Sequence, residues 1–98
     1  MSSADGQTPR GLQPSSQVVS SRLGEGAVLV HLETNQIFEL NTTGVRTWEL
    51  IVEGLDLDAV IHRLGREFDV DEGRIRAEVT DLVAALVRQG LLDDRRGG

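Results

Sequence analysis

The sequence predicts an α+β domain of winged-helix type, in which three antiparallel strands precede three α-helices (βββααα). Between residues 18 and 40, short β-prone runs are separated by turn residues, which is the pattern of an antiparallel meander. From residue 43 onward, apolar residues recur every three or four positions, which is the period of amphipathic helices. A three-stranded sheet has one face to bury, and three helices can cover that face.

The first two strands are defined by the turns that end them. Val18–Leu23 is β-prone and ends at a glycine-rich turn at residues 24–26. The next run covers residues 27–32, and residues 33–36 interrupt it. Within that interruption, Asn35 tolerates the left-handed backbone conformation that tight hairpins need.

The third strand, Ile37–Leu40, has two features that matter for function. Side-chain alternation places Phe38 and Leu40 on its core face, and Ile37 and Glu39 on the other. The run also lacks Lys and Pro, which many proteins use to block a strand edge. An open edge accepts a peptide as an additional strand, with affinity from the backbone and specificity from alternate side chains. The sequence therefore favours a small binding protein, although it does not show that this strand lies at an edge.

Three amphipathic helices are expected after the strands. Each follows an Asn or Asp, whose side chain can accept hydrogen bonds from the first-turn N–H groups. The first helix covers about residues 43–53, and the third ends at Gly90. A left-handed C-cap there would let Leu91 fold back onto Leu86. The expected N-caps are Asn41, Asp56 and Asp71.

The domain boundaries follow from composition. Residues 1–16 are rich in Ser, Gly, Gln and Pro and almost free of large apolar side chains. Such a segment cannot bury enough surface to offset the entropy of ordering it. We therefore expect a disordered tail at 1–16, a folded domain at 17–93 and a second disordered tail at 94–98.

Charge and composition argue against several classes of function. The formal net charge is −6, and the arginines lie among carboxylates rather than in a run. Nucleic-acid binding, which depends on cationic contacts to phosphate, is therefore not expected. The chain has no Cys, no signal-peptide pattern and no apolar run long enough to span a membrane. We expect a cytoplasmic, monomeric protein without a membrane partner.

The residues that usually carry catalysis are almost absent. The two histidines, His31 and His62, have no His, Cys or carboxylate partner at metal-ligand spacing. The serines gather in the N-terminal segment, where nothing is expected to orient a general base. The sequence therefore predicts a protein that is not an enzyme and holds no cofactor or metal.

Several stretches together resemble the PqqD family. Residues 27–41 resemble its strand, turn and Leu-Asn pattern, and residues 42–51 resemble the helix with a Trp that follows. Residues 68–71 and the ending Gln89-Gly-Leu-Leu92 resemble its final helix. The chain departs from the pattern at two points. Asn35 stands where a turn Gly is usual, and Ile37-Phe38 replaces an aromatic pair, which puts the accepted peptide side chain in doubt.

The resemblance implies a recognition element for ribosomally made, post-translationally modified peptides (RiPPs). Such a protein binds the leader segment of a precursor peptide as a fourth strand and presents it to a separate leader protease or other modifying enzyme. The implied groove lies between the third strand and the third helix. An equally open alternative is that the apolar helix positions are only core. The implied peptide-binding residues are Ile37, Phe38, Glu39, Leu40, Arg74, Ile75, Glu78, Val79, Leu82, Ala85 and Leu86.

The string at residues 40–44 resembles recognition proteins of lasso-peptide pathways, which work with a leader protease and a cyclase. The nearest competing interpretation is a PqqD-type chaperone that presents a precursor to a radical SAM enzyme in pyrroloquinoline quinone synthesis. Two alternatives come from other classes. One is a winged-helix nucleic-acid-binding protein, and the other is a dimerisation module that uses the same strand edge.

Overall fold

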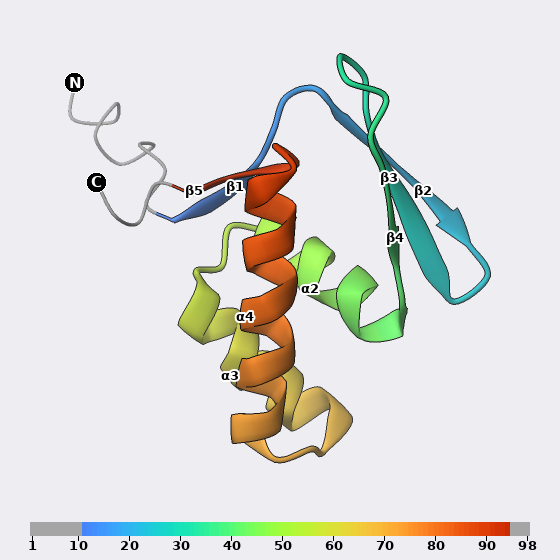
Figure 1. The fold of residues 1–98 in the computed structure, drawn as a ribbon. Helices are drawn as coiled ribbons and strands as arrows, with labels where there is room; N and C mark the ends of the chain where they lie inside the picture. Colours follow the sequence, from blue (N-terminus) through green and yellow to red (C-terminus); the bar gives the residue numbers. More distant parts are fainter. Residues whose placement is uncertain (1–10, 95–98) are drawn as a thin grey trace.

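The computed structural model describes residues 11–94, and its main sheet is a three-stranded antiparallel meander (Figure 1). The strands β2 (Val18–Leu23), β3 (Gly26–His31) and β4 (Ile37–Leu40) pair in the order β2-β3-β4. The turn before β4 contains Asn35 at a φ of 61°, as its left-handed tolerance predicts. The three predicted strands and their order are therefore confirmed.

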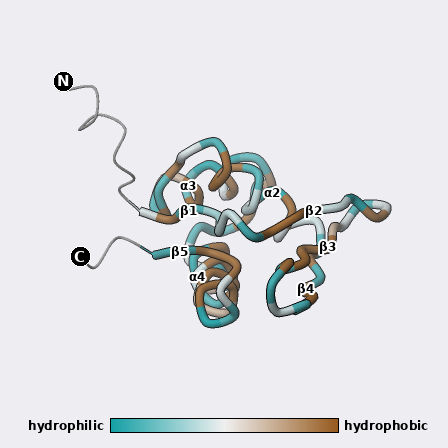
Figure 2. Tube along the Cα trace, turned by 90° about the horizontal axis from the view of Figure 1, so that it is seen from above, coloured by the Kyte–Doolittle hydropathy of each residue, from teal (hydrophilic) through white to brown (hydrophobic). Residues whose placement is uncertain are grey.

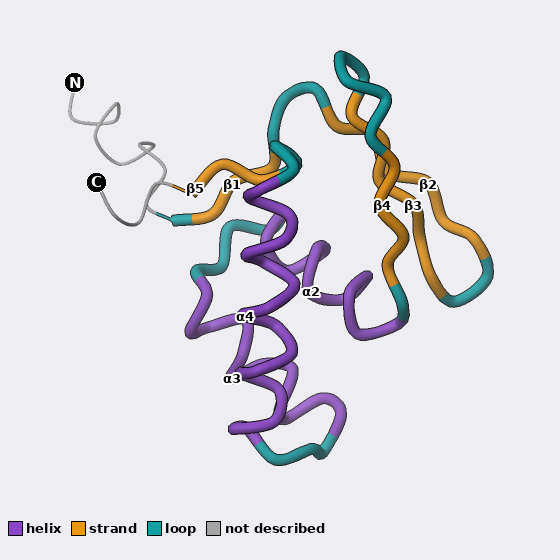
Figure 3. Tube along the Cα trace, in the orientation of Figure 1, coloured by secondary structure: helices purple, strands orange, loops and turns teal. Residues whose placement is uncertain are grey.

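Three helices follow the sheet in the described part of the chain. They are α2 (Thr42–Val52), α3 (Leu57–Phe68) and α4 (Glu72–Arg88). Together with the meander, they confirm the predicted order of three strands and then three helices. A single residue, Asn41, joins β4 to α2 (Figure 3), so the end of the edge strand and the start of the helix are held together.

The predicted N-caps begin the helices. The Asn41 Oδ1 accepts a hydrogen bond from the Gly44 N–H at 2.8 Å. The side chains of Asp56 and Asp71 cap α3 and α4 in the same way, at 2.9 Å and 3.2 Å. These bonds satisfy N–H groups that have no partner within the helix.

The C-terminal end of α4 is a Schellman motif. The Leu91 N–H donates to the Leu86 carbonyl at 2.9 Å, and the Gly90 N–H donates to the Val87 carbonyl at 3.0 Å. Gly90 has a φ of 77°, a conformation that a Cβ would strain. The turn folds Leu91 back into the core, as predicted.

One hydrophobic core joins the sheet to the helices. Its sheet side comes from the alternating inner face of β3, where Ala27, Leu29 and His31 are buried. The main helix in contact with β3 and β4 is α2, whereas α3 and α4 pack mainly on each other. This arrangement differs from the expectation that all three helices cover the sheet. The fully buried members of the core are Leu29, Leu50, Ile51, Val60, Ile61, Leu64, Val79, Leu86, Leu91 and Leu92.

The structure differs from the predicted domain boundaries at both ends. The short strand β1 (Leu12–Pro14) pairs antiparallel with β5 (Leu92–Asp94), and the Ser15 N–H donates to the Leu91 carbonyl at 3.1 Å. The exposed fraction of Leu12 is 6%, so this segment belongs to the folded domain. Composition did not predict strand β1, because only the buried side chain of Leu12 and the pairing with β5, far away in the sequence, hold it in place. The remaining tail residues, 1–10 and 95–98, lie outside the described residues.

The contribution of β1 can be measured by shortening Leu12. Replacing this buried side chain with alanine leaves a cavity, and we expect Leu12→Ala to lower the free energy of unfolding by about 2 kcal/mol. Urea denaturation measures this change. The matched control is Gln13→Ala, since Gln13 is the exposed neighbour on the same strand. Equal stability of the two variants would contradict the packing of β1.

An ion pair between α2 and α3 makes stability depend on pH. The Arg46 Nε and Nη2 donate to the two carboxylate oxygens of Glu67 at 2.8 Å and 2.9 Å. These bonds hold the pKa of the Glu67 carboxyl below its ordinary value. The stabilisation is present above the unfolded-state pKa and is lost as the pH falls through the folded-state pKa.

We therefore expect acid to lower the stability of the wild type more than that of Glu67→Gln. The glutamine side chain does not titrate, so its variant has a flatter stability curve below the ordinary glutamate pKa. Thermal melts across that pH range test the expectation. The control is Glu33→Gln, in the exposed turn before β4. Identical pH profiles for all three proteins would show that the ion pair does not contribute.

Candidate functional site

The outer edge of β4 is open. In the described part of the chain, β4 pairs with β3 alone, whereas β3 has a neighbour on each side. The strand has the predicted alternation, because Leu40 is buried and Phe38 half-buried, while Ile37 is 64% exposed and Glu39 is also exposed. A strand at the edge of a sheet offers backbone donors and acceptors to an added strand.

The register shows which backbone groups face outward. The His31 N–H donates to the Gln36 carbonyl at 2.9 Å, and hydrogen-bonded pairs alternate with non-bonded pairs in an antiparallel ladder. The next pairs are Val30 with Ile37 and Leu29 with Phe38. The backbone groups of Phe38 and Leu40 therefore point toward β3. The N–H and C=O groups of Ile37 and Glu39 point toward the open edge.

A groove runs between this edge and α4. In Figure 2, α4 is seen nearly end-on and β4 lies beside it, with α2 above both in the view. The groove has a volume of about 420 Å³ and an apolar floor of Leu40 and Leu82. A Cβ on Gly44 would lie 3.1 Å from the Leu40 Cδ2, so this glycine keeps the start of α2 close to the floor. The lining residues are Glu39, Leu40, Asn41, Gly44, Glu78, Asp81 and Leu82.

A second hollow of about 370 Å³ adjoins the groove at the start of α4, and Glu78 lines both. This second hollow continues the groove along α4 toward its start, as far as Arg74. The Arg74 Nε lies 3.6 Å from the Glu78 Oε2 on the exposed face, which is the i, i+4 spacing of a surface ion pair on a helix. Its lining residues are Thr42, Thr43, Phe68, Val70, Arg74, Ile75 and Glu78.

The predicted site residues occupy different places in the structure. Glu39, Leu40, Glu78 and Leu82 line the groove, while Arg74 and Ile75 line the adjoining hollow. Ile37 is exposed beside the open edge, and Phe38 and Ala85 are half-buried. Val79 and Leu86 are 1% and 0% exposed. They belong to the core rather than to a groove wall, because the inner face of α4 packs on the rest of the domain.

Three residues of the groove are absent from the predicted set: Asn41, Gly44 and Asp81. Asn41 and Gly44 lie at the start of α2, which the sequence did not place beside α4. Asp81 shares the exposed helical stripe of Arg74, Glu78 and Ala85, and this spacing is the signal that could have found it.

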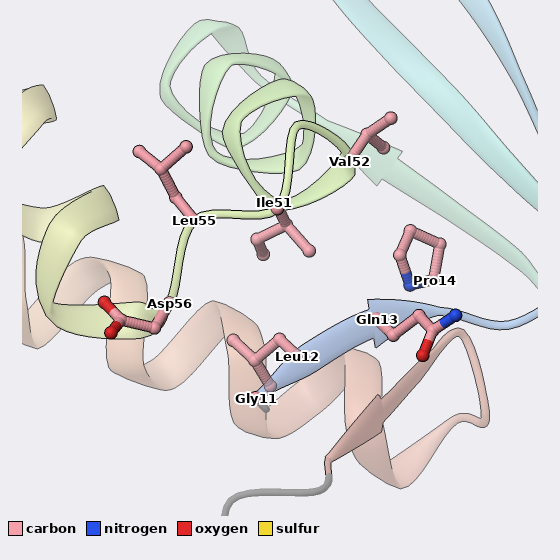
Figure 4. Close-up of a pocket in the computed structure, with 9 residues that line it drawn as sticks. Gly11, Leu12, Gln13, Pro14, Ile51, Val52, Leu55 and Asp56 are labelled. Carbon is pink, nitrogen blue, oxygen red and sulfur yellow. The ribbon is translucent and has the colours of Figure 1, made fainter. Parts of the chain in front are cut away.

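A larger hollow, of about 570 Å³, lies away from the groove, between β1 and the segment that joins α2 to α3 (Figure 4). Its walls are mainly aliphatic, with Leu12, Ile51 and Leu55 around it. The one carboxylate on its rim, Asp56, already caps α3. Among the described residues that line this hollow, there is no nucleophile, and Asp56 is already held by the helix N-terminus.

The histidines occupy structural or surface positions. The His31 side chain is 7% exposed, and its Nδ1 accepts hydrogen bonds from the N–H groups of Glu33 and Thr34 at 3.2 Å and 3.4 Å. His62 lies on the surface, 3.9 Å from Glu72. Residues 11–94 contain no group of three His, Asp or Glu side chains that could hold a metal ion. Among these residues, no helix is long and apolar enough to cross a membrane.

Fold and groove together define the class of protein: a small winged-helix-like α+β domain whose open strand edge borders a groove. The chain belongs to the PqqD family, because the family model described as coenzyme PQQ synthesis protein D (PqqD) matches residues 26–92. The predicted resemblance is thereby confirmed.

Two solved structures share the fold. One, "TbiB1 in Complex with the TbiA(beta) Leader Peptide", is 31% identical to the chain and has a TM-score of 0.76. The match covers 83% of this chain and 94% of that one. The other, "Lasso peptide synthetase B1 complexed with the leader peptide", is 18% identical with a TM-score of 0.76, and covers 85% of this chain and 98% of that one. No sequence among the curated proteins matches the chain significantly.

Proposed function

We propose that the protein binds the leader segment of a ribosomally synthesised precursor peptide and delivers it to modifying enzymes. The observation that carries this proposal is the open edge of β4 beside the groove to α4. The leader adds as a fourth strand, bonded to the outward backbone groups of Ile37 and Glu39, and places side chains in the groove. The 31% identical TbiB1, solved in complex with a leader peptide, supports this function.

The pathway we favour is lasso-peptide biosynthesis, in which the protein works with a separate leader protease and a cyclase. The basis is the resemblance of residues 40–44 to recognition proteins of such pathways. In this arrangement the protein makes no covalent change. It raises the local concentration of the precursor at the enzyme that it accompanies.

A second candidate is supported by the family itself, whose description refers to coenzyme PQQ synthesis. In that case the same groove would present a precursor to a radical SAM enzyme. The neighbouring genes distinguish the two, since a leader protease with a cyclase favours the lasso pathway and a radical enzyme favours the quinone pathway.

The binding step can be tested by titrating the ¹⁵N-labelled protein with the leader of the precursor peptide encoded beside it. We expect the largest amide shifts in Ile37–Leu40 and α4, because an added strand changes the hydrogen bonds of the first and the packing of the second. Shifts confined to α2 and α3 would contradict the groove assignment. No shift at roughly 100 µM leader, a weak affinity for a specific peptide complex, would contradict the function.

Delivery needs a separate measurement. With the leader protease purified, we expect the precursor to be cleaved faster when this protein is present. A precursor without its leader strand serves as the control, and its cleavage should not respond. Equal cleavage with and without the protein would show that binding does not assist that enzyme.

A further inference from the structure

The rim of the groove is acidic, and two of its charges have no ion-pair partner among residues 11–94. Glu39 lies on β4, and Glu78 and Asp81 lie on α4. Within residues 11–94, neither Glu39 nor Asp81 has an ion-pair partner, and Glu78 has only its exposed contact with Arg74. The carboxylates on both sides of the groove therefore remain available to a bound peptide.

Of the described arginines, only Arg74 contacts the rim, through Glu78, and four others pair with carboxylates away from the groove. Arg46 and Arg63 contact Glu67, Arg22 contacts Glu49, and Arg76 contacts Asp58. The groove is therefore acidic for two reasons: the chain carries a net charge of −6, and carboxylates gather at this groove in particular. The other described carboxylates with no arginine partner lie in turns, at helix ends or, in the case of Asp93, on β5, whereas Glu39 and Asp81 border the same groove.

Between the carboxylates, the floor is aliphatic. Leu40 comes from the strand and Leu82 from the helix, and Gly44 lets the start of α2 pack closely against Leu40. A peptide strand in this position turns alternate side chains toward the floor and toward the outer face that carries Glu39. The walls thus define a guest of mixed character, apolar where it meets the floor and positively charged where it meets the rim.

We propose that the leader of this protein is a basic segment, in which an aliphatic side chain packs on Leu40 and Leu82 and neighbouring Lys or Arg side chains face Glu39 and Asp81. The inference rests on the proposed function and specifies the chemistry of the guest. Opposite charges across neighbouring strands stabilise their pairing, and the net negative charge speeds the encounter with a cationic peptide. The rim also selects against acidic leaders, because a carboxylate placed there would meet like charge.

The test compares two double variants with equal net charge. Glu39→Gln/Asp81→Asn removes charge from the rim, and Glu25→Gln/Glu53→Gln removes the same charge from two exposed positions away from the groove. The probe is the synthetic leader of the precursor encoded beside this chain. A second version has every Lys and Arg replaced by Gln. Calorimetry at low salt and in 0.5 M NaCl gives the dissociation constants.

We expect the rim variant to bind the leader about fivefold more weakly than wild type at low salt and to lose most of the salt dependence. The control variant should bind almost as tightly as wild type, and the leader with Gln in place of Lys and Arg should bind all three proteins about equally weakly. If leader binding did not depend on salt, and the rim variant bound the leader as tightly as wild type, the proposal of a basic leader would be wrong, while leader binding itself would stand. The proposal of a basic leader would also be wrong if the natural leader proved to contain no Lys or Arg and still bound tightly. No binding of the leader to wild type would instead overturn the proposed function.

Discussion

Ile37→Pro is expected to weaken leader binding about tenfold while the fold remains intact. The N–H of Ile37 faces the open edge, so proline removes a donor that an added strand uses and that β3 does not. The net value of such a hydrogen bond is about 1 kcal/mol, and the proline ring also obstructs the incoming backbone. The side chain is 64% exposed, so its loss costs the core little. Calorimetry with the leader measures the affinity, and circular dichroism reports the fold.

The neighbouring position provides the matched control. The backbone of Phe38 faces β3, so Phe38→Pro removes a bond within the sheet and disrupts the hairpin itself. We expect a visible loss of thermal stability in this variant but not in Ile37→Pro. A folded Ile37→Pro protein that binds the leader as tightly as wild type would show that the leader does not add to β4.

Leu86→Ala is expected to lower the free energy of unfolding by about 3 kcal/mol, because it leaves a cavity at a fully buried position. In a domain of this size, that loss lowers the melting temperature by about 15 °C. Leader affinity, measured where the variant is folded, should change little. Differential scanning calorimetry and leader titration together give both quantities.

Leu82→Ala is the comparison that separates core from groove. Leu82 is half-buried and lines the groove floor, so its loss should cost only about 1 kcal/mol of stability. It should weaken leader binding more than Leu86→Ala does. If Leu86→Ala instead lowered affinity at an unchanged melting temperature, Leu86 would have to belong to the groove.

The parts of the fold that the sequence predicted are those set by local chemistry. Asn41, Asp56 and Asp71 begin helices because their side chains bond to backbone groups three residues away. Gly90 ends the last helix because the left-handed conformation there suits glycine. The β1–β5 pair was missed because its register depends on a strand at the other end of the domain, and nothing in residues 12–14 specifies it.

The candidate groove has the outline that the resemblance implied, whereas its lining residues depend on packing that the sequence does not show. The alternation followed from Ile37–Leu40 alone, whereas the choice of this strand as the open edge came from the resemblance to the PqqD family. On α4, however, Leu82 and Leu86 are both aliphatic and one turn apart, and the sequence gives no reason to separate them. Only the packing of the inner face of α4 shows that Leu86 is core and Leu82 is floor. The acidic rim was missed for a related reason, because it brings together residues from β4 and α4.

The pairing of β1 with β5 also has a consequence for the rate of unfolding. It closes almost the whole described chain into one loop, with Leu12 opposite Asp94. Closing so long a loop is entropically unfavourable before the intervening elements are in place, so we expect the pair to form after the rate-limiting step. A weakened pair would then leave the folding rate nearly unchanged and accelerate unfolding. The three-residue strand that composition assigned to a tail would thus govern how long the native domain persists.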